Sequence, residues 1–418
     1  MKDLIVEKSR LQGKVTVSGA KNSALRLLAA SLLSAERVTL RNYPSELLDA
    51  QIHVGMLEVL GKKCTLVSES EILIEDSGRI NSVLEWNDRS IRNTLLILGA
   101  LTARTGQGAV PLPGGCKLGE RAYDLHEMLL RKLGAEVWEA NDMLMAKAPP
   151  GGLVGAEIHL PIRSTGATEN SIIAGCLAKG TTRVWNPHIR PEIIDLINML
   201  NGMGARIRVY GQEHIEIRGV DGFREVNHTI IPDNMEAITW LVGAVMTNGD
   251  IEIENFPYAD LEVPLIHLRE SGAKFFSGPN SLIVRGGTCY PIEISTGPHP
   301  GINSDVQPIL AAYASCAKGE SKIIDLRFPG RYGYAEELAK MGLNYRTDGN
   351  MLTIIGNGGK LVGAKVRALD LRAGAALALC GMVSEGQTEI VESWQIGRGY
   401  NNFYSKLQQL GATVFEKD

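Results

Sequence analysis

Six similar turns, each a glycine behind a mostly apolar segment, recur along the chain. They are Leu60-Gly61, Leu133-Gly134, Met203-Gly204, Ser271-Gly272, Met341-Gly342 and Leu410-Gly411. Successive glycines lie 73, 70, 68, 70 and 69 residues apart, a period of about 70 residues. A fixed period is the sequence signature of a repeat architecture, and this one is longer than the usual solenoid repeat. We therefore expect six substantial sub-structures.

One repeat shows the expected order of elements. Apolar residues at helical spacing predict helices over 88–103 and 123–133, the second closed by Gly134. Short apolar runs predict strands over 109–112 and 156–162, and Asn141-Asp142 predicts a hairpin between strands 136–140 and 143–146. Other repeats are expected to begin with strands at 14–18, 227–231, 291–295 and 365–369. Each repeat is therefore predicted to be β-α-β-α-β-β.

Composition narrows the class of protein. The 418 residues, 44% of them hydrophobic, suffice for two or three domains with real cores, and a net charge of −4 disfavours a general nucleic-acid binder. No apolar run reaches about 18 residues and the N-terminus has no secretory h-region, so we expect no membrane partner and a cytoplasmic protein. Six scattered cysteines without a CxxC pair predict free thiols, and dispersed histidines give no reason to expect a metal.

Charged residues recur at the predicted start of the first helix of the repeats. Lys21-Asn22, Arg92 and Arg372 bring positive charge to helix starts, where the helix dipole favours negative charge. The fourth repeat carries Asp233-Asn234 there and the fifth carries Asp305, while Asp370 accompanies Arg372 in the sixth. A single such cation is ordinarily a solvated side chain at a helix edge. Three at equivalent positions predict an anion site made of helix N-terminal amides and cations.

A second set of arginines precedes the second helix of three repeats, in Gly119-Glu120-Arg121, Gly330-Arg331 and Gly397-Arg398. Glycine lets the backbone approach a ligand, and arginine offers a planar fork to a carboxylate or phosphate. Each could instead pair with a local carboxylate. If the repeats converge, the cations would hold a small, highly charged anion carrying a phosphate and a carboxylate.

The loop 113–119 places Cys116 among glycines and beside Lys117. Nearby cations lower a thiol pKa, and a glycine-rich segment can close over a ligand. Cys176, Cys316 and Cys380 lie instead on apolar helix faces, where a cysteine is ordinarily a small, inert hydrophobe.

Together these residues resemble the UDP-N-acetylglucosamine enolpyruvyl transferases. The matching stretches, collinear along nearly the whole chain, are Ser18-Gly19-Ala20-Lys21-Asn22, Pro113-Gly114-Gly115-Cys116, Gly119-x-Arg121-x-x-Asp124-Leu125-His126, Gly166-Ala167-Thr168-Glu169-Asn170, Asp370-Leu371-Arg372-Ala373 and Arg398-Gly399-Tyr400. The resemblance implies a two-domain inside-out α/β barrel, with three repeats about a pseudo-threefold axis in each domain. By analogy, residues 21–230 form the first domain, with the Cys116 loop, and 1–20 plus 231–418 form the second.

The resemblance also implies an addition–elimination reaction without metal or cofactor. The enolpyruvyl group of phosphoenolpyruvate moves to the sugar 3-hydroxyl, phosphate leaves, and peptidoglycan precursor synthesis begins. The catalytic residues implied are Cys116, Asp305 and Lys21. Phosphoenolpyruvate would be bound by Lys21, Arg92, Arg121, Arg331, Arg372 and Arg398, with Lys21, Arg121 and Arg398 on the phosphate and Arg331 and Arg372 on the carboxylate. The UDP-sugar would be bound by Asn22, Arg92, Arg121, Asp124, Leu125, Arg163, Thr165, Gly166, Asp305 and Arg331. Fosfomycin would react at Cys116.

Several positions on the nucleotide side depart from the family pattern. Where the family usually has a lysine, this chain has Ile162 followed by Arg163, and Ala122-Tyr123 stands where Pro-Val is usual. The resemblance thus supports the enolpyruvyl chemistry more strongly than the acceptor, which could be another UDP-sugar or a nucleotide. A non-catalytic regulator that binds a nucleotide sugar is a further alternative, which phosphate release would exclude. The oligomeric state is not defined by the sequence.

Overall fold

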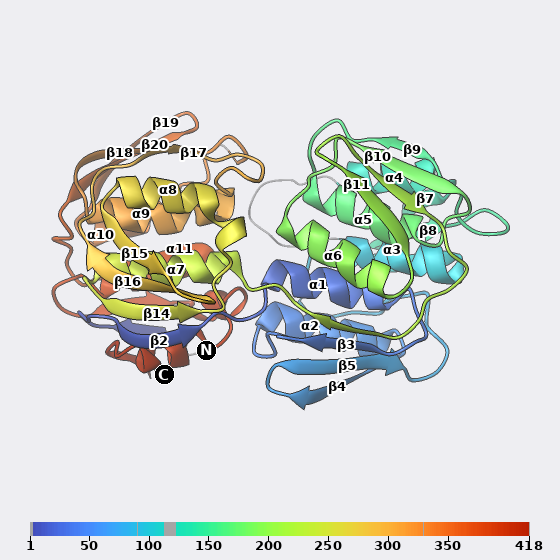
Figure 1. Cartoon of the computed structure of the whole chain (residues 1–418), viewed down its shortest axis with the longest axis horizontal. Helices are drawn as coiled ribbons and strands as arrows, with labels where there is room; N and C mark the ends of the chain where they lie inside the picture. The colour runs from blue at the N-terminus through green and yellow to red at the C-terminus, as the bar shows by residue number, and fades with distance from the viewer. Residues whose placement is uncertain (1–2, 90, 113–122, 329, 418) are drawn as a thin grey trace. The chain divides into compact units, whose positions relative to one another are not determined.

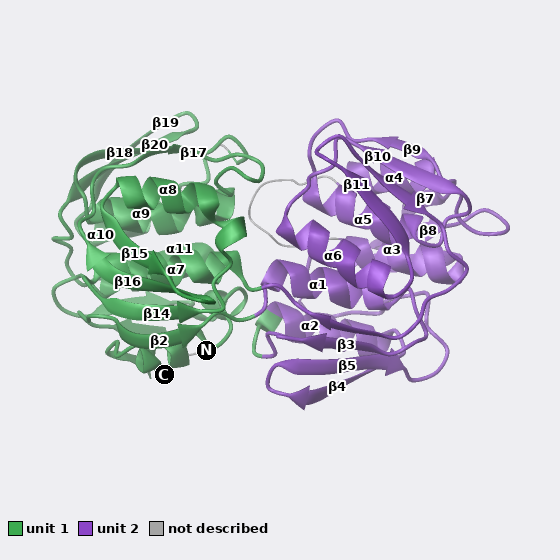
Figure 2. Cartoon of the chain, viewed as in Figure 1, with its two compact units in different colours: residues 1–18, 46–48, 232–418 green, residues 19–45, 49–231 purple. Residues whose placement is uncertain are grey.

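The computed structural model describes residues 3–89, 91–112, 123–328 and 330–417. The chain forms two compact units (Figure 2). Unit 1 comprises residues 1–18, 46–48 and 232–418, and unit 2 comprises residues 19–45 and 49–231.

The third repeat, in unit 2, has the full predicted order of elements. It consists of β9 (Glu157–His159), α5 (Thr165–Gly175), β10 (Thr181–Trp185), α6 (Pro191–Gly202), β11 (Arg206–Tyr210) and β12 (His214–Arg218). Its sheet has the order β9-β10-β12-β11, with β9 parallel to β10 and the other pairs antiparallel. A parallel pair joined by a helix, followed by a hairpin, is therefore the recurring unit.

The other two repeats of unit 2 vary this plan. The first contains α1 (Lys21–Ser31), β3 (Val38–Arg41), α2 (Leu48–Val59), β4 (Lys62–Ser68) and β5 (Glu71–Asp76), with sheet order β13-β3-β5-β4, where β13 is Val226–Thr229. The second contains α3 (Thr94–Thr105), β6 (Gln107–Pro111), α4 (Asp124–Lys132), β7 (Glu136–Ala140) and β8 (Met143–Lys147), in a three-stranded sheet β6-β8-β7. The hairpin at Asn141-Asp142 is as predicted, with φ of 53° and 59°. The helix predicted over 88–103 begins later, at Thr94, and Asn93 before it makes side-chain hydrogen bonds to distant parts of the chain.

Unit 1 repeats the arrangement three more times. Its fourth repeat contains α7 (Asn234–Met246), β14 (Asp250–Glu254), the 3-10 helix η1 (Tyr258–Asp260), α8 (Glu262–Glu270), β15 (Ala273–Ser277) and β16 (Ser281–Gly287). The fifth contains β17 (Glu293–Ser295), the 3-10 helix η2 (Ser304–Val306), α9 (Gln307–Ser315), β18 (Lys318–Ile324), α10 (Gly333–Lys340), β19 (Asn344–Asp348) and β20 (Met351–Asn357). The sixth contains β21 (Lys365–Arg367), α11 (Leu371–Gly381), β22 (Thr388–Val391), α12 (Trp394–Gly397), α13 (Phe403–Gln409) and β23 (Val414–Lys417).

The repeat glycines have a common backbone role. Gly61, Gly134, Gly204, Gly272, Gly342 and Gly411 have φ between 80° and 107°. This is the left-handed region that follows a helix end and that residues with a Cβ rarely adopt. The period of about 70 residues therefore marks a recurring helix-to-strand turn.

Strands from the N-terminus complete sheets far along the chain. The strand predicted to open the first repeat, at 14–18, is β2 (Gln12–Thr16), and it pairs in parallel with β14 of the fourth repeat. Conversely, β13 pairs with β3 of the first repeat. β1 (Asp3–Val6) lies between β22 and β23 and takes the place of a missing hairpin strand. The strands expected to open the first and fourth repeats therefore pair with strands of the fourth and first repeats, respectively.

Helices fill the interior of each unit and sheets form its outside. In unit 1, α7, α9 and α11 pack against one another, and all thirteen residues of α7 are buried (Figure 1). A helix that is largely apolar on every side needs such a central position. In unit 2, α3 packs against both α1 and α5. The strands of the described residues form six separate open sheets, so the inside-out α/β arrangement is present but no sheet closes into a barrel.

Candidate active site

Unit 1 gathers two carboxylates around one buried arginine. Arg331 Nη1 donates to Asp305 Oδ1 at 2.9 Å, and Nη2 donates to Asp370 Oδ2 at 3.3 Å. The arginine side chain is 10% exposed and that of Asp305 is 33% exposed. Burial opposes the charge, but the two carboxylates outweigh it and raise the pKa of Arg331 above its ordinary value. Because these carboxylates belong to the starts of the fifth and sixth repeats, the pairing is not local.

Arg372 is a cation buried among few partners. It is 1% exposed, and its guanidinium lies over the Tyr400 ring, 4.9 Å from the centroid. Burial opposes its charge, but Tyr400, Asp233 and Asp305 raise the pKa of Arg372. Its Nε and Nη1 atoms nevertheless have no hydrogen-bond partner in the described protein, and the same is true of Arg331 Nε. Buried donors without acceptors are costly, so three at neighbouring arginines indicate a place for an anion.

The helix amides beside Arg372 are not bare, which corrects the sequence-based picture of the anion site. Asp370 is the N-cap of α11, and its Oδ1 accepts from the amides of Arg372 and Ala373, each at 2.8 Å. Asp233 caps α7 in the same way. The positive charge at α11 is thus balanced by a capping carboxylate, and the guanidinium carries the donors available to a ligand.

Arg398 closes α12 close to Tyr400. Its Nη1 donates to Gln395 Oε1 at 3.1 Å, and its side chain is half-buried. The next residue, Gly399, packs so closely that a Cβ would lie 2.1 Å from Leu371 Cδ1. This contact fixes the segment Arg398–Tyr400 against the start of α11, the helix that carries Arg372.

Unit 2 places a lysine at the start of α1. Lys21 is 8% exposed, and its Nζ lies 2.8 Å from Oδ2 of the buried Asp49. No side chain caps α1. Lys21 is therefore not a solvated helix-edge residue.

Asn22 stands next to a buried ionic network. Its Oδ1 lies 3.5 Å from Arg26 Nη1, and Arg26 Nε donates to Glu169 Oε1 at 2.8 Å. Burial raises the pKa of Glu169 above its ordinary value, and the charge of Arg26 offsets this only in part. The residue predicted to contact the sugar thus belongs to a network that spans α1 and α5.

Two asparagine–histidine pairs recur in unit 2 and were not predicted as functional. Asn93 donates to Leu25 O and contacts His53 Nδ1 at 3.0 Å, and Asn170 donates to Leu95 O and contacts His126 Nδ1 at 3.0 Å. Burial, aided by a nearby arginine, lowers the pKa of each histidine to about 3. The signal for these asparagines was visible as Lys21-Asn22-Ser23, Arg92-Asn93-Thr94 and Glu169-Asn170-Ser171.

The remaining predicted acceptor residues lie near the starts of α3, α4 and α5. Arg92 is exposed just before α3, and its charge acts on His126. Asp124 is exposed and Leu125 half-buried at the start of α4. Arg163 Nε lies 3.4 Å from Asn186 Oδ1, and Thr165 Oγ1 lies 2.8 Å from His188 Nδ1. Gly166 lies against the His126 ring, because its Cβ would be 3.2 Å from Nε2.

Cys116 and Arg121 lie outside the described residues. Among the described cysteines, burial raises the pKa of Cys64 and of Cys176 to about 12. These thiols are therefore poor nucleophiles.

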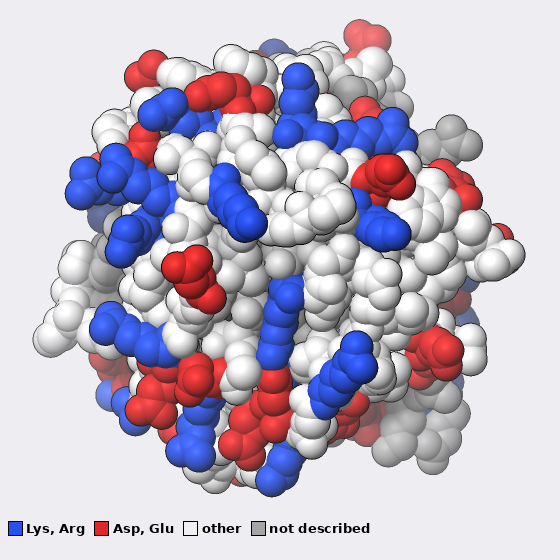
Figure 3. Space-filling view, turned by 90° about the vertical axis from the view of Figure 1, so that its right-hand side faces the viewer, with Lys and Arg blue, Asp and Glu red and all other residues white. Residues whose placement is uncertain are grey.

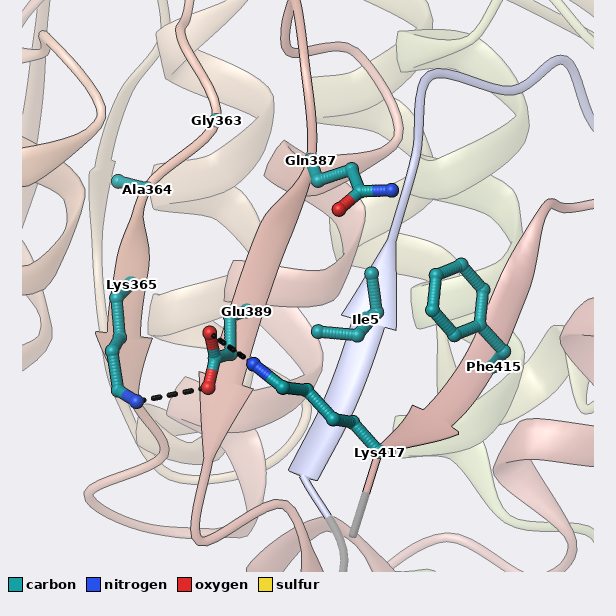
Figure 4. A pocket seen from close by; sticks show the side chains of 8 residues that line it. All are labelled: Ile5, Gly363, Ala364, Lys365, Gln387, Glu389, Phe415 and Lys417. Carbon is teal, nitrogen blue, oxygen red and sulfur yellow. Dashed lines mark hydrogen bonds and ion pairs between the residues drawn. The ribbon is translucent and has the colours of Figure 1, made fainter.

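Two surface features carry no site chemistry. A hollow of about 530 Å³ on the sheet β21-β22-β1-β23 holds Lys365 and Lys417, both paired with Glu389 at 2.9 and 3.2 Å (Figure 4). The carboxylate of Glu389 therefore pairs with both lysines. On the face in Figure 3, positive and negative side chains are interspersed, so no field of one sign dominates it.

Two kinds of feature are absent from the described part of the chain. In the described residues no group of three or more His, Cys, Asp or Glu side chains is placed to hold a metal ion. Of the helices described, none has the length and apolar character needed to cross a membrane.

Comparison with known proteins gives consistent matches along the chain. The family model for EPSP synthase (3-phosphoshikimate 1-carboxyvinyltransferase) matches residues 5–407. The chain is 42% identical to UDP-N-acetylglucosamine 1-carboxyvinyltransferase 1 of Carboxydothermus hydrogenoformans, covering 99% of this chain and 97% of the relative. It is 38% identical to UDP-N-acetylglucosamine 1-carboxyvinyltransferase of Finegoldia magna, covering 99% and 98%.

Solved structures share the fold. The enolpyruvyl transferase NikO from Streptomyces tendae superposes with a TM-score of 0.89 at 24% identity, covering 100% of this chain and 99% of that one. EPSP synthase from Acinetobacter baumannii superposes with a TM-score of 0.78 at 18% identity, covering 100% of both chains.

Proposed function

The chain belongs to the EPSP synthase family of enolpyruvyl (1-carboxyvinyl) transferases, and from that premise we propose that it transfers the enolpyruvyl group of phosphoenolpyruvate to the 3-hydroxyl of UDP-N-acetylglucosamine. The relatives that match over nearly their whole length are named for this acceptor. The products are the enolpyruvyl ether and inorganic phosphate.

The reaction proceeds by addition and then elimination. The sugar hydroxyl loses its proton and its oxygen bonds to C2 of phosphoenolpyruvate, while C3 gains a proton. In the tetrahedral intermediate C2 carries both the sugar oxygen and the phosphate. Cleavage of the C2–O bond to phosphate, with loss of a proton from C3, regenerates the double bond. The protein must therefore supply a base, an acid and fixed positive charge.

The unpaired guanidinium donors of unit 1 are the observation that carries this proposal. Arg372 offers Nε and Nη1, and Arg331 offers Nε, all buried and without acceptors in the described protein. A guanidinium fork matches a carboxylate with two parallel hydrogen bonds. We assign the carboxylate of phosphoenolpyruvate to these two arginines. Its phosphate is assigned to Lys21, Arg121 and Arg398.

The acid–base roles fall to Asp305 and Cys116. Asp305 is the partly exposed carboxylate that Arg331 holds at 2.9 Å, and an ionised carboxylate next to a fixed cation is able to take the hydroxyl proton. Cys116 is proposed to supply or relay the proton at C3. No step of this scheme passes through a metal or an organic cofactor.

The acceptor side rests on unit 2. Asn22 and Arg163 are half-buried, and their side chains contact those of Arg26 and Asn186, respectively. Arg163 lies two residues before Thr165, the first residue of α5. We propose that Arg163 takes the role of the lysine usual in the family. Asp124, Leu125, Thr165 and Gly166 are proposed to complete the acceptor site with Arg92.

A phosphate-release assay tests the function directly. Purified protein with phosphoenolpyruvate is offered UDP-N-acetylglucosamine, other UDP-sugars, UMP and shikimate 3-phosphate in parallel. We expect phosphate release with UDP-N-acetylglucosamine to be at least tenfold more efficient than with the others. A tenfold preference for another UDP-sugar or UMP would replace the acceptor and keep the chemistry. No release with any acceptor would refute enolpyruvyl transfer.

The proposal also fixes a place for the reaction. Phosphoenolpyruvate and UDP-sugars are highly charged and do not cross a lipid bilayer unaided. We therefore propose a cytoplasmic step that begins peptidoglycan precursor synthesis.

A further inference from the structure

Asp325 is a buried carboxylate immediately after β18, at the centre of unit 1's polar interior. It is 0% exposed, and no role has been assigned to it above. Its own amide donates to Asn350 O at 2.9 Å. Its two carboxylate oxygens accept hydrogen bonds from five donors. Four of these donors belong to two segments that each carry a proposed active-site residue, and the fifth is the hydroxyl of Thr296.

One carboxylate oxygen holds the segment around Asp305. Ser304 Oγ donates to Asp325 Oδ2 at 2.6 Å, and Gln307 Nε2 donates to the same oxygen at 2.9 Å. These residues flank Asp305 on its two sides along the chain. Asn303 Oδ1 accepts from the Asp305 amide at 3.0 Å, which fixes the start of the same turn. The direction of the Asp305 side chain therefore depends on anchors to Asp325.

The other oxygen holds the segment that leads to Arg331. The amides of Arg327 and Phe328 donate to Asp325 Oδ1 at 2.9 and 3.0 Å. Phe328 O in turn accepts from the Arg331 amide at 3.2 Å. Thr296 Oγ1 also donates to Oδ1, at 2.9 Å, and accepts from the Leu326 amide. One side chain thus holds the backbone at Arg327 and Phe328, shortly before Arg331.

We propose that Asp325 is a positioning residue that holds Asp305 and Arg331 at their 2.9 Å separation for the transfer reaction. The inference rests on the proposed function, because it assumes that this pair acts in catalysis. Tyr334 Oη donates a hydrogen bond to Gln307 Oε1, which connects the start of α10 to the residues around Asp325. All five neighbours donate, so both oxygens must be acceptors. An amide in this place would turn a donor towards at least two donors and release one segment.

The test compares Asp325→Asn with Asp76→Asn. Asp76 is a carboxylate of unit 2 that pairs with Lys62 at 2.7 Å and with Arg104, and neither partner is assigned a role in the reaction. Both variants lose buried ionic or polar contacts and are expected to melt at lower temperature. We expect kcat of Asp325→Asn to fall at least about tenfold, since misplacement of about 1 Å costs up to a hundredfold. Its Kd for UDP-N-acetylglucosamine, measured without phosphoenolpyruvate, should change less than threefold, and kcat of Asp76→Asn less than twofold.

A second pair of variants covers the case in which Asp325→Asn does not fold. Ser304→Ala removes only one bond to Oδ2, and Ser271→Ala removes a buried serine hydroxyl elsewhere in unit 1. We expect kcat to fall at least threefold in the first and to stay within twofold in the second. Wild-type kcat in a folded Asp325→Asn would overturn the proposal, and where Asp325→Asn does not fold, wild-type kcat in Ser304→Ala would overturn it.

Hydrogen exchange separates failure of this inference from failure of the proposed function. Amides of 303–307 and 326–334 should exchange faster in Asp325→Asn than in wild type, while only those of 303–307 should do so in Ser304→Ala. A wild-type protein that releases no phosphate refutes the function, whatever the exchange shows. An active wild type with unchanged exchange in both segments of Asp325→Asn refutes the positioning role.

Discussion

Replacing Arg372 with methionine should remove the use of phosphoenolpyruvate without weakening the fold. The side chain is 1% exposed, and two of its donors, Nε and Nη1, have no acceptor in the described protein. Each such donor costs about 1–3 kcal/mol of folding free energy. Against this stand the contact with the Tyr400 ring, worth about 0.5–2 kcal/mol, and the attraction of Asp233 and Asp305, which also favours the cation. Methionine has a similar length and no donors, so we expect the free energy of unfolding to stay within about 1 kcal/mol of wild type or to rise.

The effect on catalysis should be large. Two charge-assisted hydrogen bonds to the carboxylate of phosphoenolpyruvate contribute about 1.5–3 kcal/mol each, or about 3–6 kcal/mol together. Since about 1.4 kcal/mol corresponds to a factor of ten, kcat/KM for phosphoenolpyruvate should fall about a hundredfold to ten-thousandfold. The Kd for UDP-N-acetylglucosamine should change little, because the acceptor residues proposed here are elsewhere.

Two measurements decide the prediction. Urea unfolding followed by tryptophan fluorescence gives the stability of the ligand-free protein, and phosphate release at varied phosphoenolpyruvate gives kcat/KM. Arg346→Met, an exposed arginine of the same unit paired with Glu320, is the control and should change neither. A loss of more than about 3 kcal/mol in stability would show that the Arg372 charge is fully paired within the protein, as expected when a buried ion pair is broken. That result would refute the assignment of a carboxylate to its donors.

Four further results are expected. Asp305→Asn should abolish phosphate release with an unchanged melting temperature, and near-normal turnover would remove it from the role of base. Arg398→Ala and Arg121→Ala should each lower kcat/KM for phosphoenolpyruvate by about ten- to a hundredfold, with acceptor Kd by calorimetry nearly unchanged; equal effects on both would contradict the phosphate assignment. Brief exposure to fosfomycin, followed by peptide mass spectrometry, should label Cys116, and the labelling should be faster when acceptor is bound. Burial raises the pKa of Cys64 and of Cys176 to about 12, so label on either of these instead would count against a reactive Cys116. Burial lowers the pKa of His53 and of His126 from 6.5 to about 3, aided by the charge of Arg26 on the first and of Arg92 on the second. The unfolded state therefore binds more protons between these pH values, so the free energy of unfolding should fall as pH drops from about 6.5 to 3. In urea unfolding His126→Gln should show a smaller fall than wild type, and an identical fall would refute this cause.

Local features of the sequence predicted the repeat well. Each closing glycine occupies a left-handed turn that only its own residue type favours, so the period was visible without any tertiary information. The hairpin at Asn141-Asp142 was equally local. The pairing of β2 with β14 was not predictable in this way, because parallel partners more than 200 residues apart share no local signal. The strand predicted at 14–18 was therefore placed in the wrong repeat.

In the candidate site, too, the residues with a local sequence signal were predictable and those brought together only by the fold were not. Arginines beside glycines and at helix starts stood out because they break local preferences. Asp325 breaks none: an aspartate after a strand is an ordinary turn residue, and only the fold brings Ser304, Gln307 and Phe328 to its two oxygens. The asparagines Asn93 and Asn170 are intermediate, since their repeated spacing was visible but their histidine partners were not.

The cost of burying Arg372 and Arg331 is the strongest link from fold to chemistry. Asp305 and Asp370 pair with Arg331, and nearby groups favour the charge of Arg372, yet three guanidinium donors of these side chains still lack acceptors in the described protein. Departures from local optima are expected at functional sites, and their energetic cost is recovered only when a ligand supplies the missing acceptors. A doubly charged carboxylate–phosphate ligand that binds the folded state alone would recover it, and would raise the melting temperature of the wild type. Since Arg372→Met has no such donors to satisfy, phosphoenolpyruvate should stabilise that variant less than wild type, which ties the strain in unit 1 to the proposed substrate.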